Sequence, residues 1–172
     1  CQVLADLLTV KEHKGELKGL KLAFVGDAQN NVTHSLALIC DALDMEFACA
    51  APKGDWIKEE IVKKLKREIL QTTDPKKAVK DADVVVTDTW VCMGEEKEKK
   101  KRLKVFPPYQ VNKKLMALAH KDAIFMHCLP AYRGYEVTDE VIDGPQSVVF
   151  DEAENRLHAQ KALMLHTLRI QY

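Results

Sequence analysis

Short apolar runs rich in β-branched residues alternate along this chain with segments of helical pattern, and this alternation restricts the fold more than any other feature. The runs that predict strands are residues 21–27, 46–51, 68–72, 84–88, 123–127 and 147–150. The segments that predict helices are residues 2–12, 33–43, 56–66, 75–81, 111–119, 138–142 and 153–168. Because the strand runs are apolar almost throughout, we expect strands buried on both faces, as in a parallel sheet. The pattern predicts an α/β fold, a three-layer Rossmann-like domain with a mainly parallel sheet flanked by helices.

Length and charge narrow the function classes. The 172 residues suit a single domain over 1–172. The 26 basic and 26 acidic side chains balance to zero net charge, which gives no electrostatic reason to expect a nucleic-acid or anionic-membrane partner. No apolar run approaches the ~20 residues of a membrane helix, and the first residues lack the order of a signal peptide. The charge run at 95–104 predicts a solvated loop or helix, or a loop over a site.

The cysteines favour a reducing compartment. There are five of them, an odd number, and no two are spaced as Cys-x-x-Cys. This argues against a disulfide framework or a zinc knuckle, and for a cytoplasmic protein. Cys40 and Cys49 are expected to be small apolar fillers of the core. Cys128 differs, because it follows an apolar run within His127-Cys128-Leu129-Pro130.

Polar clusters follow three of the predicted strands. They are Gly26-Asp27-Ala28-Gln29-Asn30-Asn31, Asp88-Thr89-Trp90 and His127-Cys128-Leu129-Pro130. Ligands of open α/β sheets bind outside the carboxyl ends of the strands. We therefore expect Asn31, Asp88, His127 and Cys128 to line one crevice.

Each of these residues also has a purely structural interpretation. Asn30 and Asn31 could serve only a turn and a helix cap, Asp88 could be a structural carboxylate, and His127 could be a hydrogen-bonded core histidine. The convergence of three clusters favours a site. The first cluster lacks the later glycines of a dinucleotide fingerprint, and the chain has no P-loop.

The chemistry of these side chains suits an amino acid and an anionic electrophile. Asp88 offers an anion for an ammonium group, and Asn31 offers both a donor and an acceptor. His127 can donate to a polarised carbonyl oxygen. Cys128 can contact an amine, or act as a nucleophile if its pKa is lowered. Arg156 can bind a phosphate or carboxylate, or lie on the surface.

Six segments carry a resemblance to a known family. They are CQVLADLLT (1–9), GDAQNNVTHS (26–35), TDTWVCMGEE (87–96), FPPYQVN (106–112), HCLPA (127–131) and FDEAENRLHAQK (150–161). In this order they make the chain resemble the second, ornithine-binding domain of ornithine carbamoyltransferase, in the aspartate/ornithine carbamoyltransferase family. HCLP favours the ornithine branch, because the aspartate branch has proline in place of the cysteine.

The resemblance implies a reaction and a set of site residues. The reaction transfers a carbamoyl group from carbamoyl phosphate to the side-chain amine of L-ornithine, giving citrulline and phosphate in arginine metabolism. The implied ornithine-binding residues are Asn31, Asp88, Cys92 and Met93, and those for carbamoyl phosphate are Gln2, Cys128, Leu129 and Arg156. The implied catalytic residues are Asp88, Cys128 and His127, with His127 facing the carbamoyl group. No metal or organic cofactor is implied.

Three departures from the family pattern matter. Cys92 stands where the family has serine, so we expect weaker ornithine binding than in a Cys92→Ser variant, because a thiol is the poorer hydrogen-bond partner. The stretch 54–73 is shorter than expected. The chain also begins inside the family's His-Pro-x-Gln motif, and no Ser-Thr-Arg-Thr loop occurs.

The last departure predicts that the carbamoyl phosphate-binding domain is absent. That domain carries most of the family's trimer contacts, so homo-oligomerisation is left open. We expect the chain alone to be inactive or nearly so, with partly exposed apolar faces on its first and last helices. The alternatives are a free-standing amino-acid-binding module, a carbamoyltransferase for putrescine or an acylated ornithine, and a subunit completed by a separate first-domain chain.

Overall fold

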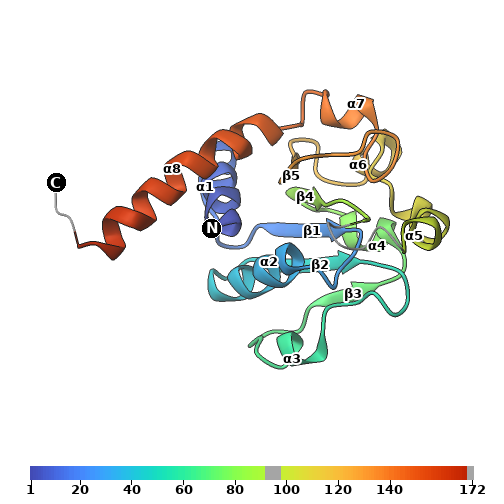
Figure 1. Cartoon of the computed structure of the whole chain (residues 1–172), viewed down its shortest axis with the longest axis horizontal. Helices are drawn as coiled ribbons and strands as arrows, with labels where there is room; N and C mark the ends of the chain where they lie inside the picture. The colour runs from blue at the N-terminus through green and yellow to red at the C-terminus, as the bar shows by residue number, and fades with distance from the viewer. Residues whose placement is uncertain (92–97, 170–172) are drawn as a thin grey trace.

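A parallel sheet organises the molecule. The computed structural model describes residues 1–91 and 98–169, and in them the sheet has five strands in the order β3-β2-β1-β4-β5 (Figure 1). The strands are β1 (Lys21–Val25), β2 (Glu46–Ala50), β3 (Leu70–Thr72), β4 (Val84–Thr87) and β5 (Ile124–His127). All pairs are parallel. Val25 is in register with Thr87, and Thr87 with His127, so β1, β4 and β5 end level with one another.

Helices cover both faces of this sheet. They are α1 (Gln2–Lys14), α2 (Asn31–Ala42), α3 (Glu59–Val62), α4 (Pro75–Val79), α5 (Lys99–Val105), α6 (Lys113–Met116), α7 (Asp139–Ile142) and α8 (Val149–Thr167), with a 3-10 turn at Pro107–Tyr109. One core cluster joins alternate strand residues such as Leu22 and Phe24 to α1 and α2. The other joins Ala23 and Val25 to α4, α6 and α7. The predicted three-layer α/β architecture is confirmed.

One predicted strand is wrong. Residues 147–150 make only an isolated bridge, in which Ser147 pairs with Phe125. The Val148 N–H donates to the Phe125 carbonyl, and Val148 then becomes the N-cap of α8. Asp151 and Glu152 lie in the first turn of α8, where negative charge suits the helix dipole. The long C-terminal helix therefore begins earlier than predicted.

Side-chain caps explain where two helices begin. Asn30 accepts the Thr33 N–H at 2.8 Å and starts α2 at Asn31. Asn112 accepts the Leu115 N–H at 3.0 Å and starts α6 at Lys113, so the predicted helix over 111–119 is much shorter. The segment predicted as a helix over 56–66 is helical only in α3.

The first and last helices lie side by side, and α8 continues beyond the body of the molecule (Figure 1). Buried Asn155 of α8 donates to Thr9 Oγ1 at 3.0 Å and to Glu12 Oε2 at 2.6 Å on α1. Further along α8, Met164 and Leu168 are more than half exposed. This agrees with the expected exposure of apolar side chains. Within the described chain, no helix has the length and apolar character needed to cross a membrane.

Candidate active site

The level ends of β4 and β5 bring three of the predicted residues together. Asp88 follows β4, His127 ends β5, and Cys128 comes next. One carboxylate oxygen of Asp88, one ring nitrogen of His127 and the sulfur of Cys128 lie within 4.8 Å of one another. This group forms at the carboxyl edge of the sheet, as the sequence predicts for ligand sites in open α/β folds.

Asp88 is the centre of this group. Its Oδ1 accepts the Thr89 N–H at 2.7 Å and the Cys128 thiol at 3.4 Å, and its Oδ2 accepts Asn30 Nδ2 at 3.2 Å. Burial raises the pKa of Asp88, against the opposing effect of the Thr89 N–H. A carboxylate with a raised pKa is a stronger base than an exposed aspartate. The geometry suits binding an ammonium group and accepting its proton.

The two neighbouring asparagines have different positions. Asn30 is buried, caps α2 and also contacts Asp88. Asn31 is the first residue of α2 and is exposed. Sequence reasoning treated Asn30 only as a turn or cap, and missed that the same side chain also holds Asp88. A role for Asn31 in substrate binding stays a prediction.

Cys128 is a neutral hydrogen-bond donor in this arrangement. Its partial burial raises the pKa of the thiol, and the negative charge and hydrogen bond of Asp88 raise that pKa further. A nucleophilic cysteine requires the opposite shift. The alternative of a nucleophilic Cys128 is therefore not supported, and contact of Cys128 with an amine stays a prediction.

The ring of His127 is fully engaged by the protein. Its Nδ1 accepts the Leu129 N–H at 2.9 Å, so Nε2 carries the proton and donates to Glu136 Oε1 at 3.2 Å. His127 and Glu136 are both completely buried. The resemblance implies a ring that faces the carbamoyl group, and this structure instead places it inside the protein, where it fixes the backbone of Leu129.

Two buried glutamates therefore hold the His127 segment, and sequence analysis missed both. Glu136 also accepts the Tyr132 N–H at 2.5 Å. Glu152 of α8 accepts the backbone N–H of His127 at 2.8 Å. Glu136 lies in an irregular loop and carries no sequence signal. Glu152 lies in the FDEAENR segment, but helical spacing alone does not distinguish it from its exposed neighbours.

A second polar group lies between α1 and α8. Arg156 Nη1 donates to Gln2 Oε1 at 2.6 Å, so two predicted carbamoyl phosphate residues are in contact. Gln2 Nε2 donates to Asp6 Oδ1 at 2.6 Å and to Glu152 Oε1 at 3.2 Å. Burial raises the pKa of Asp6 to about 6 and that of Glu152 to about 9. Neither acid was singled out from the sequence.

The remaining predictions are placed as follows. Leu129 is partly buried and has a positive φ of 55°, in the turn that the His127 ring holds. Cys92 and Met93 lie outside the described residues. Asp88, His127 and Cys128 carry metal-ligand atoms. However, Nδ1 of His127 already accepts a hydrogen bond. Of this group, Asp88 and Cys128 are then left as metal ligands, whereas a catalytic zinc has three protein ligands.

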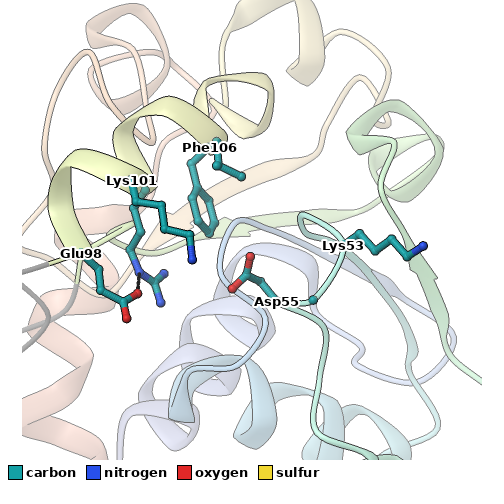
Figure 2. A pocket seen from close by; sticks show the side chains of 8 residues that line it. Lys53, Asp55, Glu98, Lys101 and Phe106 are labelled. Atoms are coloured by element: carbon teal, nitrogen blue, oxygen red, sulfur yellow. Dashed lines mark ion pairs between the residues drawn. The ribbon is translucent and has the colours of Figure 1, made fainter.

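An arginine that sequence analysis did not single out ties α5 to the crevice. Arg102 Nη1 donates to Asp27 Oδ2 at 2.7 Å and to the Trp90 carbonyl at 3.1 Å. Its guanidinium lies 5.5 Å from the centre of the Phe106 ring. Figure 2 shows the adjacent cavity of about 300 Å³, with Asp55 facing α5 from the loop after β2. Arg102 thus fixes the chain on both sides of the segment that contains Cys92 and Met93.

Comparison with known proteins gives a consistent family. Residues 18–167 match the family model described as "Aspartate/ornithine carbamoyltransferase, Asp/Orn binding domain". The chain is 58% identical to an ornithine carbamoyltransferase of Caldicellulosiruptor saccharolyticus, over 95% of this chain and 55% of that protein. It is 56% identical to one of Methanobrevibacter smithii, over 98% of this chain and 58% of that protein.

Solved structures agree with these relatives. The ornithine carbamoyltransferase of Pyrococcus furiosus superposes with a TM-score of 0.89 at 50% identity, over 96% of this chain and 55% of that one. The anabolic enzyme of Campylobacter jejuni gives a TM-score of 0.89 at 40% identity, over 99% of this chain and 58% of that one. The chain therefore spans little more than half the length of the relatives it matches.

Proposed function

The chain belongs to the aspartate/ornithine carbamoyltransferase family, and from that membership we propose that it is the ornithine-binding half of an ornithine carbamoyltransferase. The observation that carries the proposal is the contact of Asp88 with Cys128 and Asn30 at the carboxyl edge of the sheet. In the proposed reaction the side-chain amine of ornithine attacks the carbonyl carbon of carbamoyl phosphate. A C–N bond forms and the C–O bond to phosphate breaks. Phosphate leaves with the electron pair of that bond and takes the proton that the nitrogen loses after the attack.

Asp88 and Cys128 act on the amine in this proposal. The amine attacks only when neutral, so a group beside it must take its proton. Asp88 is that group, and its raised pKa makes the transfer easier. Cys128, held as a neutral thiol by Asp88, orients the amine. Asn31, Cys92 and Met93 are proposed to bind the amino-acid end of ornithine.

Carbamoyl phosphate is proposed to bind on the α1/α8 side. Arg156 supplies a cation for the phosphate, while Gln2 and the Cys128-Leu129 backbone face the carbamoyl group. His127 acts as a positioning residue, because its ring nitrogens hold Leu129 and Glu136. Its effect on catalysis is exerted through the backbone that it fixes.

The described residues supply one side of this site. The chain spans 55% of the C. saccharolyticus relative, and we propose that the rest of the carbamoyl phosphate site comes from a portion homologous to the remainder of such proteins. Proximity of both substrates supplies a large part of such a rate enhancement, so the chain alone is expected to be inactive or nearly so. We propose a cytoplasmic role in arginine metabolism, within a homo-oligomer.

Two alternative functions would use the same Asp88 group. A binding module without catalysis would use the same Asp88 group to hold ornithine. A carbamoyltransferase for putrescine or an acylated ornithine would use it for an amine and differ at the amino-acid end. Calorimetry of the chain with L-ornithine, putrescine and N-acetylornithine ranks these ligands directly.

The decisive experiment is a chimera. The portion of the P. furiosus relative that precedes its match to this chain is joined in frame to residue 1. We expect the folded chimera to form citrulline from ornithine and carbamoyl phosphate, and the chain alone to form little or none. Asp88→Asn should remove activity and ornithine binding, while Asp122→Asn, at an exposed acid paired with Lys14, should change neither. A folded, assembled chimera that forms no citrulline would overturn the proposal.

A further inference from the structure

The side-chain amide of Gln2 forms hydrogen bonds with two buried acids and an arginine. Its Nε2 lies 2.6 Å from Asp6 Oδ1 and 3.2 Å from Glu152 Oε1, and its Oε1 lies 2.6 Å from Arg156 Nη1. Asp6 is 3% exposed and Glu152 is 2% exposed. The three partners come from the first turns of α1 and the first half of α8.

This contact set allows one orientation of the amide. A guanidinium has donors and no acceptor, so the atom facing Arg156 must be the amide oxygen. The amide nitrogen has two hydrogens, and Asp6 and Glu152 take one each. The only hydrogen-bonding capacity that Gln2 keeps is the second lone pair of Oε1. Gln2 therefore presents an acceptor, and no donor, to a ligand.

We propose that Asp6 and Glu152 are specificity-determining positioning residues, which fix Gln2 so that its oxygen accepts an N–H of the carbamoyl group. The inference rests on the proposed function and adds the basis of substrate choice. A carbamoyl group ends in NH2, which donates, whereas an acetyl group ends in a methyl, which does not. A site whose acceptor is fixed in place rejects the analogue that lacks the matching donor.

The charges around the pair are compatible with binding a phosphate. Asp6 on α1 faces Arg156 of α8, Glu152 and the N-terminal amine, and Glu152 faces Asp6, Asp88 after β4 and the His127 N–H of β5. Burial raises the pKa of both acids, so near neutral pH the two share a proton and carry about one negative charge. Arg156 balances that charge. A fully ionised pair would repel the phosphate beside which Gln2 is expected to act.

The first test is made on the 172-residue chain by NMR. The side-chain amide protons of Gln2 should be protected from exchange with solvent. The double variant Asp6→Asn/Glu152→Gln keeps the shape of both side chains and removes their charge, so it should fold. In it the Gln2 amide protons should exchange at least about tenfold faster, because the single negative charge that the two acids share is lost from the acceptors of the amide. Glu154→Gln, an exposed acid two residues further along α8, is the matched control and should change nothing.

The second test measures specificity in the chimera. Acetyl phosphate is used as an inhibitor, and the ratio of its inhibition constant to the KM for carbamoyl phosphate measures the discrimination between the two compounds. The double variant should lose at least about tenfold of this discrimination, with little change in the KM for ornithine. A purely structural role would raise both KM values together.

Three outcomes separate the proposals. Unchanged Gln2 exchange in the double variant overturns the inference. Faster exchange with unchanged discrimination against acetyl phosphate also overturns it. A chimera with the unaltered sequence that forms no citrulline overturns the proposed function instead, and the exchange data then still report whether the acids fix the Gln2 amide.

Discussion

At the scale of single residues, the site depends on polar side chains that control one another's protonation and orientation. Burial and the carboxylate of Asp88 keep the thiol of Cys128 protonated, and the thiol in turn donates to the carboxylate. His127 illustrates the same dependence, because the hydrogen bond from Leu129 determines which ring nitrogen carries the proton. The residue types were evident from the sequence, but these states follow only from the contacts.

The state of Cys128 gives a first prediction. Alkylation requires the thiolate, and both burial and the negative charge of Asp88 raise the pKa of Cys128. At pH 8 iodoacetamide should therefore label Cys128 at least about tenfold more slowly than exposed Cys1. Asp88→Asn removes the charge and should speed the labelling of Cys128, as followed by mass spectrometry of the peptides. Labelling of Cys1 is the internal control, and equal rates at Cys128 in both proteins would contradict the assignment.

At the scale of helices and strands, the sequence was sufficient to predict those elements that the pattern of apolar residues determines. The five strands and the two-sided burial follow from apolar runs, and each strand lies within its predicted range. Residues 147–150 have the same apolar character but form a bridge and a helix start. The backbone N–H of Val148 donates to the carbonyl of Phe125, which is distant in sequence. Glu136, Glu152 and Arg102 were missed for the same reason. Their roles arise from tertiary contacts that no local pattern encodes.

The attachment of α5 gives a second prediction. Arg102 and Asp27 form a nearly buried ion pair, with side chains 11% and 4% exposed. Arg102→Leu would leave Asp27 buried without its cation and should lower the free energy of unfolding by about 3 kcal/mol. Asp27→Asn in the same chain should restore much of the loss, because the unpaired charge is removed. Urea titration measures both variants. Lys101→Leu, at an exposed neighbour, is the control, and an equal effect there would contradict the role of the pair.

The contact of α1 with α8 gives a third prediction. Asn155 is 5% exposed and donates to both Thr9 and Glu12. Asn155→Ala leaves these two acceptors without their donor and creates a small cavity, so the free energy of unfolding should fall by about 1–3 kcal/mol. Lys161→Ala, on the exposed surface of the same helix, should have an effect of less than about 0.5 kcal/mol. Equal urea midpoints for the two variants would show that the helices are held by other contacts.

At the scale of the whole molecule, the two proposed substrate sites adjoin each other where the sheet edge approaches the α1/α8 pair. Glu152 is the physical link, because one carboxylate contacts His127 at the end of β5 and Gln2 on α1. The family match, the half-length overlap with relatives and the Asp88 group all fit a site completed by further protein. Protonation of Glu152 therefore affects both the stability of this domain and the hydrogen bonds of its proposed site.

That shared group gives the last prediction, a dependence of stability on pH. Burial raises the pKa of Glu152 from 4.5 to about 9, so between these values the folded chain holds a proton that the unfolded chain has lost. Stability from this group is complete below pH 4.5 and decreases as the pH rises, by up to about 1.4 kcal/mol per pH unit. Glu152→Gln cannot ionise, so it should abolish this decrease and be the more stable protein at pH 8. Asp6, whose pKa is raised to about 6, makes stability depend on pH in the same way at lower pH. Urea midpoints are therefore compared between pH 6.5 and 9. Glu154→Gln should follow the unaltered chain, and parallel curves for Glu152→Gln and the unaltered chain would show that Glu152 is ionised in the fold.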